Sequence, residues 1–163
     1  MHKVHRYHDI CAGHRVTRHE SKCQHLHGHN YRVHFTCVVD ESRISKELGS
    51  RLDTVGRVID FSVVKEKLCM WLEVEWDHKF LAWEKDPLIR AIDGAVGKQA
   101  VEGDAGFGKW KESIVWVPFN PTAENMAEHL VKVIGPQQLA GTGVVLTEVL
   151  IEETAKCHAS YGV

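Results

Sequence analysis

The alternation of apolar and polar residues predicts three long β-strands. In the segment 30–40 every second residue is apolar or a cysteine, and most of the intervening positions are polar or charged. A period of two with aromatic and β-branched side chains is typical of a half-buried strand. We expect residues 2–16, whose alternation is weaker, to form its antiparallel partner. The third strand is predicted at Val144–Thr154, with one face formed by Val145, Thr147, Val149, Ile151 and Glu153.

Two amphipathic helices are predicted from apolar residues at helical spacing. The first begins at Asp60, a typical N-cap residue, and its apolar positions are Phe61, Val64, Leu68, Trp71 and Leu72. The second follows Asn120-Pro121-Thr122, because these residues supply a capping side chain and a proline suited to a first turn. Its apolar stripe consists of Met126, Ala127, Leu130, Val131 and Ile134. We expect Gly135-Pro136 to end it.

The segment between the two helices is less regular. Residues 114–119 form a short strand candidate, whereas 88–113 are rich in glycine and weakly patterned. We interpret 88–113 as an inserted loop. The predicted order of elements is β-β-α-loop-β-α-β, which favours a single α+β domain over residues 1–163. In this fold class two helices cover one face of an antiparallel sheet.

Composition excludes several classes of partner. The chain has 163 residues, with 22 acidic and 20 basic side chains and a formal net charge of −2. This near-neutral charge gives no electrostatic basis for binding nucleic acid or an anionic membrane. No run of about 18 apolar residues is present, and the first residues lack the apolar stretch of a signal peptide. We therefore expect a cytoplasmic protein that binds neither nucleic acid nor membrane.

The five cysteines show no short paired spacing, so neither a disulfide framework nor a Cys-x-x-Cys motif is expected. Four of them are interpreted as small buried apolar residues: Cys11, Cys37, Cys69 and Cys157. Cys23 differs because Ser21, Lys22, Gln24 and His25 make a polar surrounding. A thiol close to imidazoles or a metal can have a lowered pKa, so Cys23 is a candidate thiolate base or nucleophile.

Histidines are concentrated near the N-terminus, with nine of the twelve in the first 34 residues. In an extended segment, His27 and His29 point to the same side and can reach one ion, while Gly28 leaves room for a close backbone approach. His14 is the best candidate for a third ligand, because it lies on the expected neighbouring strand. Three imidazoles around Zn²⁺ leave one open position, as in catalytic zinc sites. The alternative is that these histidines are ordinary polar surface residues.

Two other folds that place His-x-His at a metal fit poorly. Metal-dependent amidohydrolases need a barrel of about 250 residues, which this chain cannot supply. Cupins need an acidic ligand a few residues later, and here that region reads Tyr31-Arg32-Val33-His34-Phe35.

Three further residues are candidates for proton transfer or ligand binding. The carboxylate of Asp77 can orient the imidazole of His78 for proton transfer, although such a dipeptide is more often a surface pair. Glu153 is an acidic residue at the end of an otherwise apolar strand face. Its alternative reading is a strand that simply reaches solvent there.

Taken together, these motifs resemble the 6-pyruvoyl-tetrahydropterin synthase family, and in particular its carboxy-forming branch. The matching segments occur in the family's order and span nearly the whole chain apart from 88–113. They are Ala12-Gly13-His14-Arg15, Lys22-Cys23-Gln24-His25-Leu26-His27-Gly28-His29-Asn30-Tyr31, Val58-Ile59-Asp60-Phe61, Trp76-Asp77-His78, Asn120-Pro121-Thr122-Ala123-Glu124-Asn125 and Ile151-Glu152-Glu153-Thr154.

The resemblance implies the tunnelling fold, in which antiparallel sheets of several subunits close into a β-barrel. It implies a homo-oligomer, a hexamer or tetramer, with active sites between subunits. It assigns His14, His27 and His29 to zinc. It also implies that Cys23 is the catalytic thiol and that Asp77 and His78 are the proton-handling pair. Glu153 is implied to accept hydrogen bonds from the pterin ring.

The implied reaction converts 7,8-dihydroneopterin triphosphate into 6-carboxytetrahydropterin, acetaldehyde and triphosphate, a step toward queuosine. Three residues separate Cys23 from His27-Gly28-His29, as in the carboxy-forming branch. The alternatives are pyruvoyl-forming activity within the family, a non-catalytic zinc- or pterin-binding protein of the same fold, and a structural zinc protein in which Cys23 is the fourth ligand.

Overall fold

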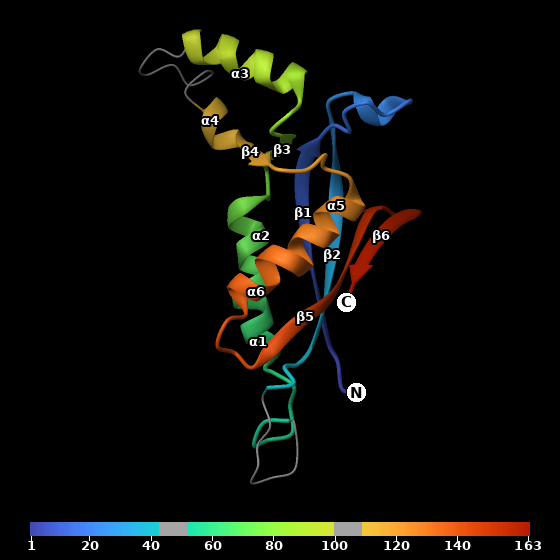
Figure 1. Cartoon of the computed structure of the whole chain (residues 1–163), viewed down its shortest axis with the longest axis vertical. Coiled ribbons are helices and arrows are strands. Elements are labelled where there is room, and N and C mark those ends of the chain that lie inside the picture. The colour runs from blue at the N-terminus through green and yellow to red at the C-terminus, as the bar shows by residue number, and fades with distance from the viewer. Residues whose placement is uncertain (43–51, 100–108) are drawn as a thin grey trace.

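A computed structural model of the chain describes residues 1–42, 52–99 and 109–163. Its centre is one six-stranded sheet with the strand order β4-β3-β1-β2-β5-β6 (Figure 1). The strands are β1 (Val4–His14), β2 (His27–Val39), β3 (Phe80–Trp83), β4 (Ile114–Val117), β5 (Val144–Thr154) and β6 (Cys157–Gly162). The four strands expected from the sequence are therefore present, and β3 and β6 are additions.

The three long strands pair antiparallel, as predicted. β1 pairs with β2 from Val4 opposite Cys37 to His14 opposite His27. β2 and β5 are also antiparallel, and β5 continues into β6 through a hairpin. β3 is parallel to β1 and to β4. The sheet is thus antiparallel at its centre, with a short parallel extension at one edge.

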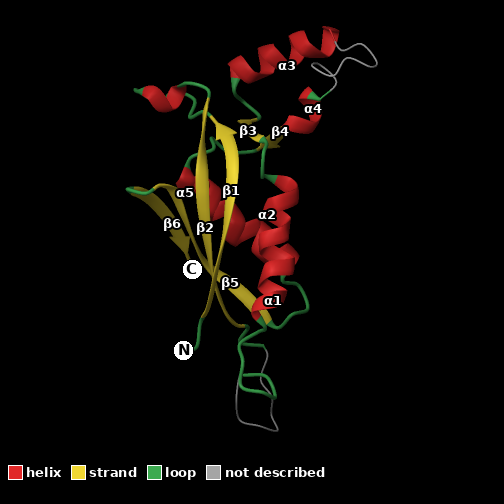
Figure 2. Ribbon diagram, turned by 180° about the vertical axis from the view of Figure 1, so that it is seen from behind, coloured by secondary structure: helices red, strands yellow, loops and turns green. Residues whose placement is uncertain are grey.

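Two helical runs cover one face of the sheet, which confirms the predicted α+β layering (Figure 2). The first consists of α1 (Phe61–Val64), a π-helical turn (Lys65–Cys69) and α2 (Met70–Glu75). The second consists of α5 (Ala123–His129), a π-helical turn (Leu130–Ile134) and α6 (Gly135–Gln138). Among the residues that the structure describes, no helix is both long and apolar enough to cross a membrane.

The core lies between these helices and the sheet, and its largest side chains are completely shielded from solvent. They include Tyr31, Phe35, Leu68, Leu72, Trp76, Met126, Leu130 and Ile151. Most of the apolar helical positions read from the sequence belong to this core. Phe61 is an exception, because its side chain is 58% exposed.

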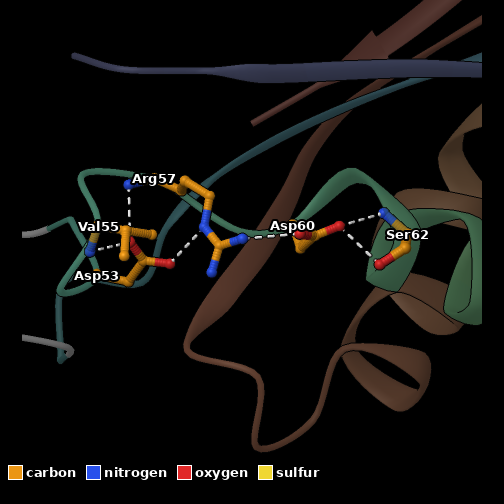
Figure 3. Close-up of polar contacts among 5 residues, drawn as sticks. All are labelled: Asp53, Val55, Arg57, Asp60 and Ser62. Atoms are coloured by element: carbon orange, nitrogen blue, oxygen red, sulfur yellow. Dashed lines mark hydrogen bonds and ion pairs between the residues drawn. The ribbon is translucent and has the colours of Figure 1, made fainter.

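Asp60 begins the first helical run, as predicted, and it does so within a larger polar network (Figure 3). Its Oδ1 accepts hydrogen bonds from the backbone N–H and the hydroxyl of Ser62, at 2.8 and 2.6 Å. Arg57 links its Oδ2 to the carboxylate of Asp53, with nitrogen–oxygen distances of 2.7 and 2.9 Å. The carboxylate thus satisfies an N–H that has no partner inside the helix.

The expected end of the second helix at Gly135-Pro136 is wrong, because the run continues through α6. Proline needs no N–H partner here, since it stands in the first turn of α6 after a π-helical turn. Gly135 is required for packing rather than for termination. A Cβ at this position would lie 2.9 Å from the Cβ of Leu146.

The predicted single face of β5 is also wrong, because a β-bulge divides the strand. Thr36 pairs with Glu148 and Cys37 with Leu146, so the register shifts by one residue at Thr147. A one-residue shift moves the following side chains to the other face. Val149 and Ile151 are buried together with Leu146, whereas Val145 is 38% exposed.

The segment interpreted as an inserted loop, 88–113, is partly helical. It contains α3 (Pro87–Gln99) and α4 (Trp110–Ser113), while residues 100–108 lie outside the described part of the chain. α3 extends from the same end of the molecule as β3 and β4 (Figure 1). Two glycines within α3 weaken its helical signal in the sequence, and its start depends on Asp86, which the pattern analysis did not use.

Candidate metal and thiol site

Three histidines converge at one end of the central strand pair. His14 is the last residue of β1, His27 is the first residue of β2, and the two are paired in the sheet. Their Nε2 atoms lie 3.1 Å apart. The ring of His29 joins them, and one nitrogen of each imidazole lies within 4.8 Å of the others. The structure therefore brings together the three metal ligands predicted from the sequence.

The glycine between His27 and His29 is dictated by the backbone, as expected. A Cβ at Gly28 would lie 2.9 Å from the carbonyl oxygen of Ala12 on β1. Any larger residue would push the two strands apart at this point. Gly28 therefore allows β1 and β2 to hold His14 next to His27.

Two of the imidazoles are oriented by backbone carbonyls. His14 donates Nδ1–H to the carbonyl of Pro121 and His27 donates Nδ1–H to the carbonyl of His25, both at 2.7 Å. These hydrogen bonds leave Nε2 unprotonated in the neutral ring, with its lone pair directed into the cluster. A backbone carbonyl that accepts from one ring nitrogen commonly fixes the tautomer of a metal-binding histidine.

The electrostatics favour the neutral form of His14 and His29. Burial lowers the pKa of His14 to about 4, and the neighbouring imidazoles of His27 and His29 add to the effect against the opposing hydrogen bond to Pro121. Burial also lowers the pKa of His29, and the nearby Glu153 carboxylate opposes that change. Neutral imidazoles at physiological pH are the form that coordinates metals.

The arrangement fits a metal ion. Two nitrogens bound to one tetrahedral Zn²⁺ would be separated by about 3.3 Å, from bond lengths of about 2.0–2.1 Å. The observed separation between His14 and His27 is 3.1 Å. In addition, His29 Nε2 is buried and makes no hydrogen bond within the described residues. A polar atom in that position needs a partner, and a cation at the centre of the cluster would provide one.

Glu153 lies directly beside the cluster rather than in solvent. Its Oε1 is 3.4 Å from His14 Nε2 and 3.5 Å from His29 Nε2. Tyr31, which is 1% exposed, is packed against the rings of His14 and His29. Burial raises the pKa of Tyr31, and the charge of Glu153 adds to the increase. The strand therefore ends in a carboxylate that faces the predicted metal ligands.

Cys23 shares a cavity with Glu153. It lies in a short 3-10 turn, η1 (Lys22–Gln24), and is partly exposed. The cavity has a volume of about 290 Å³ and is also lined by Val16, His19 and residues of β6. The loop is closed by a 2.7 Å hydrogen bond from Val16 N–H to the carbonyl of Cys23. Within the described chain, the group of close metal-ligating side chains holds the three histidines and not this thiol.

Asp77 and His78 form the predicted pair. His78 Nδ1 lies 2.6 Å from Asp77 Oδ2, and Asp77 Oδ1 accepts a 2.8 Å hydrogen bond from Cys11 N–H. Although burial opposes it, the hydrogen bonds from Cys11 and His78 keep the pKa of Asp77 below its usual range. His78 has a left-handed backbone, with φ 56°, which is uncommon for a residue other than glycine.

The structure does not bring this pair to Cys23 within one chain. The imidazole of His78 is 79% exposed and lines two cavities of about 640 and 510 Å³. His29 lines the first of these, but Cys23 lines neither. The thiol and the imidazole thus open onto different spaces.

The remaining cysteines only partly match expectation. Cys37 and Cys69 are buried, as predicted. Cys11 and Cys157 are exposed, so the interpretation as buried apolar residues is wrong for these two. Cys11 lies on the face of β1 opposite Ile10 and Ala12, and its thiol donates to the side-chain oxygen of Asn30 at 3.2 Å. The weak alternation of β1 concealed this orientation.

Sequence reasoning missed the residues that hold the site in place. Asn120 bonds both backbone groups of Thr17, accepting from its N–H and donating to its carbonyl, each at 2.9 Å. The next residue, Pro121, orients His14. The Asn-Pro-Thr segment was recognised as a helix start, and its capping role at Thr122 is confirmed. Nothing in its local pattern indicates that it also contacts His14.

Fold and site together define an α+β protein with a three-histidine cluster, able to hold a metal ion, beside a free thiol and a carboxylate. The family model of 6-pyruvoyl tetrahydropterin synthase matches residues 3–162. The chain therefore belongs to this family, which confirms the family predicted from the motifs and, with it, the prediction of an enzyme.

Individual relatives agree with this assignment. The chain is 32% identical over 149 residues to 6-carboxy-5,6,7,8-tetrahydropterin synthase of Rickettsia typhi, which covers 91% of each chain. An uncharacterized protein of Wolinella succinogenes has a similar structure, with a TM-score of 0.79, 23% identity and coverage of 99% and 97%. The 6-pyruvoyl tetrahydropterin synthase of Plasmodium vivax gives a TM-score of 0.63 at 16% identity, with 100% of both chains covered. The last two similarities support the tunnelling fold.

Proposed function

We propose that the protein is a zinc-dependent lyase that converts 7,8-dihydroneopterin triphosphate and one water into 6-carboxy-5,6,7,8-tetrahydropterin, acetaldehyde and triphosphate. The product would be a precursor of queuosine and other 7-deazapurines. Because all five cysteines are unpaired, a reducing cytoplasm suits the chain.

The observation that carries the proposal is the placement of Cys23 and Glu153 around one cavity beside the three-histidine cluster. A protein that bound zinc and pterin without turnover would not require the thiol. The relative from Rickettsia typhi bears the name of the carboxy-forming enzyme. Cys23 also keeps the three-residue spacing to His27 that the family resemblance implies for that branch.

Each of these residues has a chemical role in the proposed reaction. His14, His27 and His29 would hold the ion, which when bound would supply Lewis-acid polarisation of the substrate's side-chain oxygens. Glu153 accepts two hydrogen bonds from the pterin amino group and ring N–H. Cys23, as thiolate, removes the proton from the carbon next to the polarised oxygen.

The Asp77–His78 pair handles the second proton, and we propose that it comes from another copy of the chain. Its imidazole is exposed and opens onto different cavities from Cys23 in the same chain. A site completed across an interface would use both groups, as the predicted hexamer or tetramer requires. Asp77 would hold His78 in one tautomer through the 2.6 Å contact.

This assembly is tested by mixing two inactive variants, Cys23→Ala and His78→Ala. If each site combines residues of two copies, randomly mixed oligomers regain about a quarter of wild-type activity, since one site in four then has both groups. Each variant alone stays inactive and serves as the control. A mixture that remains inactive after subunit exchange, shown by mass spectrometry of tagged copies, would contradict the proposal.

Three alternatives lead to different outcomes. A pyruvoyl-forming enzyme would use the same residues and release triphosphate without acetaldehyde. A non-catalytic protein would bind the pterin and release nothing. In a structural zinc protein, chelation would unfold the chain and Cys23 would be a ligand, whereas the described cluster does not include this thiol.

The experiment that separates these functions is substitution of Cys23 by alanine, with Cys157→Ala as matched control on the same cavity. Product formation from 7,8-dihydroneopterin triphosphate should fall at least a hundredfold in the first variant, since general acid–base groups contribute about 10²–10⁴. Bound zinc, measured by atomic absorption, should be unchanged in both. Loss of zinc together with turnover in Cys23→Ala would instead favour the structural reading.

A further inference from the structure

Asp86 is a buried carboxylate that the proposed chemistry does not use. Its side chain is 1% exposed and lies directly before α3. Oδ1 accepts hydrogen bonds from the backbone N–H groups of Leu88 and Ile89, at 2.9 and 3.3 Å, and so caps the helix. A buried charge is costly unless it is fully paired, so the partners of its second oxygen are informative.

That second oxygen binds the segment that follows the metal ligand His14. Thr17 donates its hydroxyl to Asp86 Oδ2 at 2.7 Å. Arg15 Nε lies 3.0 Å from the same oxygen, as an ion pair that is not aligned as a hydrogen bond. This guanidinium is only 11% exposed, and its ion pair holds it against the buried carboxylate of Asp86. One carboxylate therefore joins the start of α3 to residues 15–17.

The same short segment is also hydrogen-bonded to the backbone of Cys23. Val16, between the two partners of Asp86, donates its N–H to the carbonyl of Cys23 at 2.7 Å. The carbonyl of Val16 in turn accepts from the N–H of His19, at 3.3 Å. Residues 15–17 thus form the base of the loop that presents the thiol to the cavity.

The opposite side of this base is held by Asn120, through its two hydrogen bonds to the backbone of Thr17. Asn120 is itself bound by Asn125 of α5, whose side chain donates to its carbonyl at 2.9 Å. Asp86 and Asn120 therefore hold Thr17 from two sides, because Asp86 bonds its hydroxyl and Asn120 bonds its backbone. If either set of hydrogen bonds is removed, we expect the loop to stay attached but to lose its defined position.

We infer that Asp86 is a positioning residue for Cys23, and that α3 is anchored to the reaction site through it. The inference gives a role to α3, the first described part of the segment that matches none of the family motifs. It rests on the proposed function for the value of a well-placed thiol, but the mechanical link is independent of that function. A displacement of about 1 Å at a reacting group can lower turnover by about a hundredfold.

The test uses two variants and one control in the full-length, zinc-loaded protein. Thr17→Val removes only the hydroxyl that donates to Asp86 and preserves the shape of the side chain. Asp86→Asn removes the charge of the carboxylate. Thr142→Val is the matched control, because its hydroxyl also closes a local contact, to the carbonyl of Leu139 at 2.6 Å, near the opposite end of β5 from Glu153. Thr17→Val keeps the test informative if Asp86→Asn does not fold.

Two readings are taken from each folded protein: kcat with KM, and the rate at which iodoacetamide alkylates Cys23. The exposed Cys11 and Cys157 serve as internal references for alkylation. We expect kcat to fall roughly tenfold to a hundredfold with little change in KM. Cys23 should be alkylated at least about three times faster relative to the references, because a freed loop exposes the thiol more often.

Unchanged kcat and unchanged Cys23 alkylation in a folded Thr17→Val protein would overturn the inference, even if that protein were less stable. In that case Asp86 would be a helix cap and nothing more. If the wild-type protein has no lyase activity, the proposed function fails, but the alkylation rates still decide whether Asp86 positions the thiol.

Discussion

His14 gives the metal-free protein a defined sensitivity to acid. The imidazole is 1% exposed and stays neutral in the folded state, where burial lowers its pKa to about 4. In the unfolded chain the same group has a pKa of about 6.5. Between these two values the unfolded chain binds a proton that the folded chain does not, so folding stability falls as pH decreases.

The size of the effect follows from the two pKa values. At pH 7 the contribution is only about 0.2 kcal/mol, because the folded group is neutral and about a quarter of the unfolded chains are protonated at this imidazole. At pH 4 protonation of this one imidazole lowers the free energy of unfolding by about 3 kcal/mol. Each pKa unit corresponds to about 1.36 kcal/mol, and the folded group is half protonated at this pH. For a domain of this size, that is a substantial fraction of the total stability.

The assay is urea unfolding of chelator-treated protein at pH 7 and at pH 4, with the variant His14→Gln alongside the wild type. The variant should lose about 3 kcal/mol less between the two pH values, whatever its stability at pH 7. His2→Gln, at an exposed position, controls for the loss of an imidazole as such. An equal acid-induced loss in wild type and His14→Gln would refute the reasoning that a buried neutral His14 sets this sensitivity.

Three further predictions concern single features. Glu153→Gln should lower kcat/KM roughly a hundredfold, as expected for a charge-assisted pair worth about 3 kcal/mol, while zinc affinity stays within a few-fold; a large loss of zinc affinity would make the carboxylate a metal ligand. Asp60→Ala should destabilise the protein by about 1 kcal/mol in urea unfolding through loss of the N-cap, and a change below about 0.3 kcal/mol would show that the cap is dispensable. In native protein, iodoacetamide should modify the exposed Cys11 but leave Cys37 and Cys69 unmodified until the protein unfolds. Both thiols are buried, and burial raises the pKa of Cys37 to about 12 and also raises the pKa of Cys69. Similar labelling rates for all three cysteines, measured by peptide mass spectrometry, would contradict the burial.

The features that could be predicted from sequence are those determined by neighbours along the chain. β2 has a regular period of two, and Asp60 and Thr122 are residue types that cap helices whatever surrounds them. The three-histidine cluster was predictable because His27 and His29 are two residues apart on a strand. His14 could be added to the cluster on the single assumption that β1 is the antiparallel neighbour of β2, which the register confirms.

The features that could not be predicted depend on contacts between distant segments. The bulge opposite Thr36 moves the side chains of half of β5 to the other face of the sheet, and no residue type in β5 indicates a bulge there. α3 contains glycines that lower its intrinsic helix propensity, and its start is fixed by a carboxylate that also binds Thr17, far away in sequence. The orientation of His14 depends on the carbonyl of Pro121, and a backbone carbonyl has no sequence signature.

Identification of the reaction product is the most direct test of the proposed lyase activity. Zinc-loaded protein is incubated with 7,8-dihydroneopterin triphosphate, and the pterin product is identified by mass spectrometry while acetaldehyde is trapped as a hydrazone. We expect 6-carboxytetrahydropterin and acetaldehyde in equal amounts, both reduced at least a hundredfold with Cys23→Ala. A pyruvoyl product without acetaldehyde, or bound substrate that is never converted, would contradict this expectation.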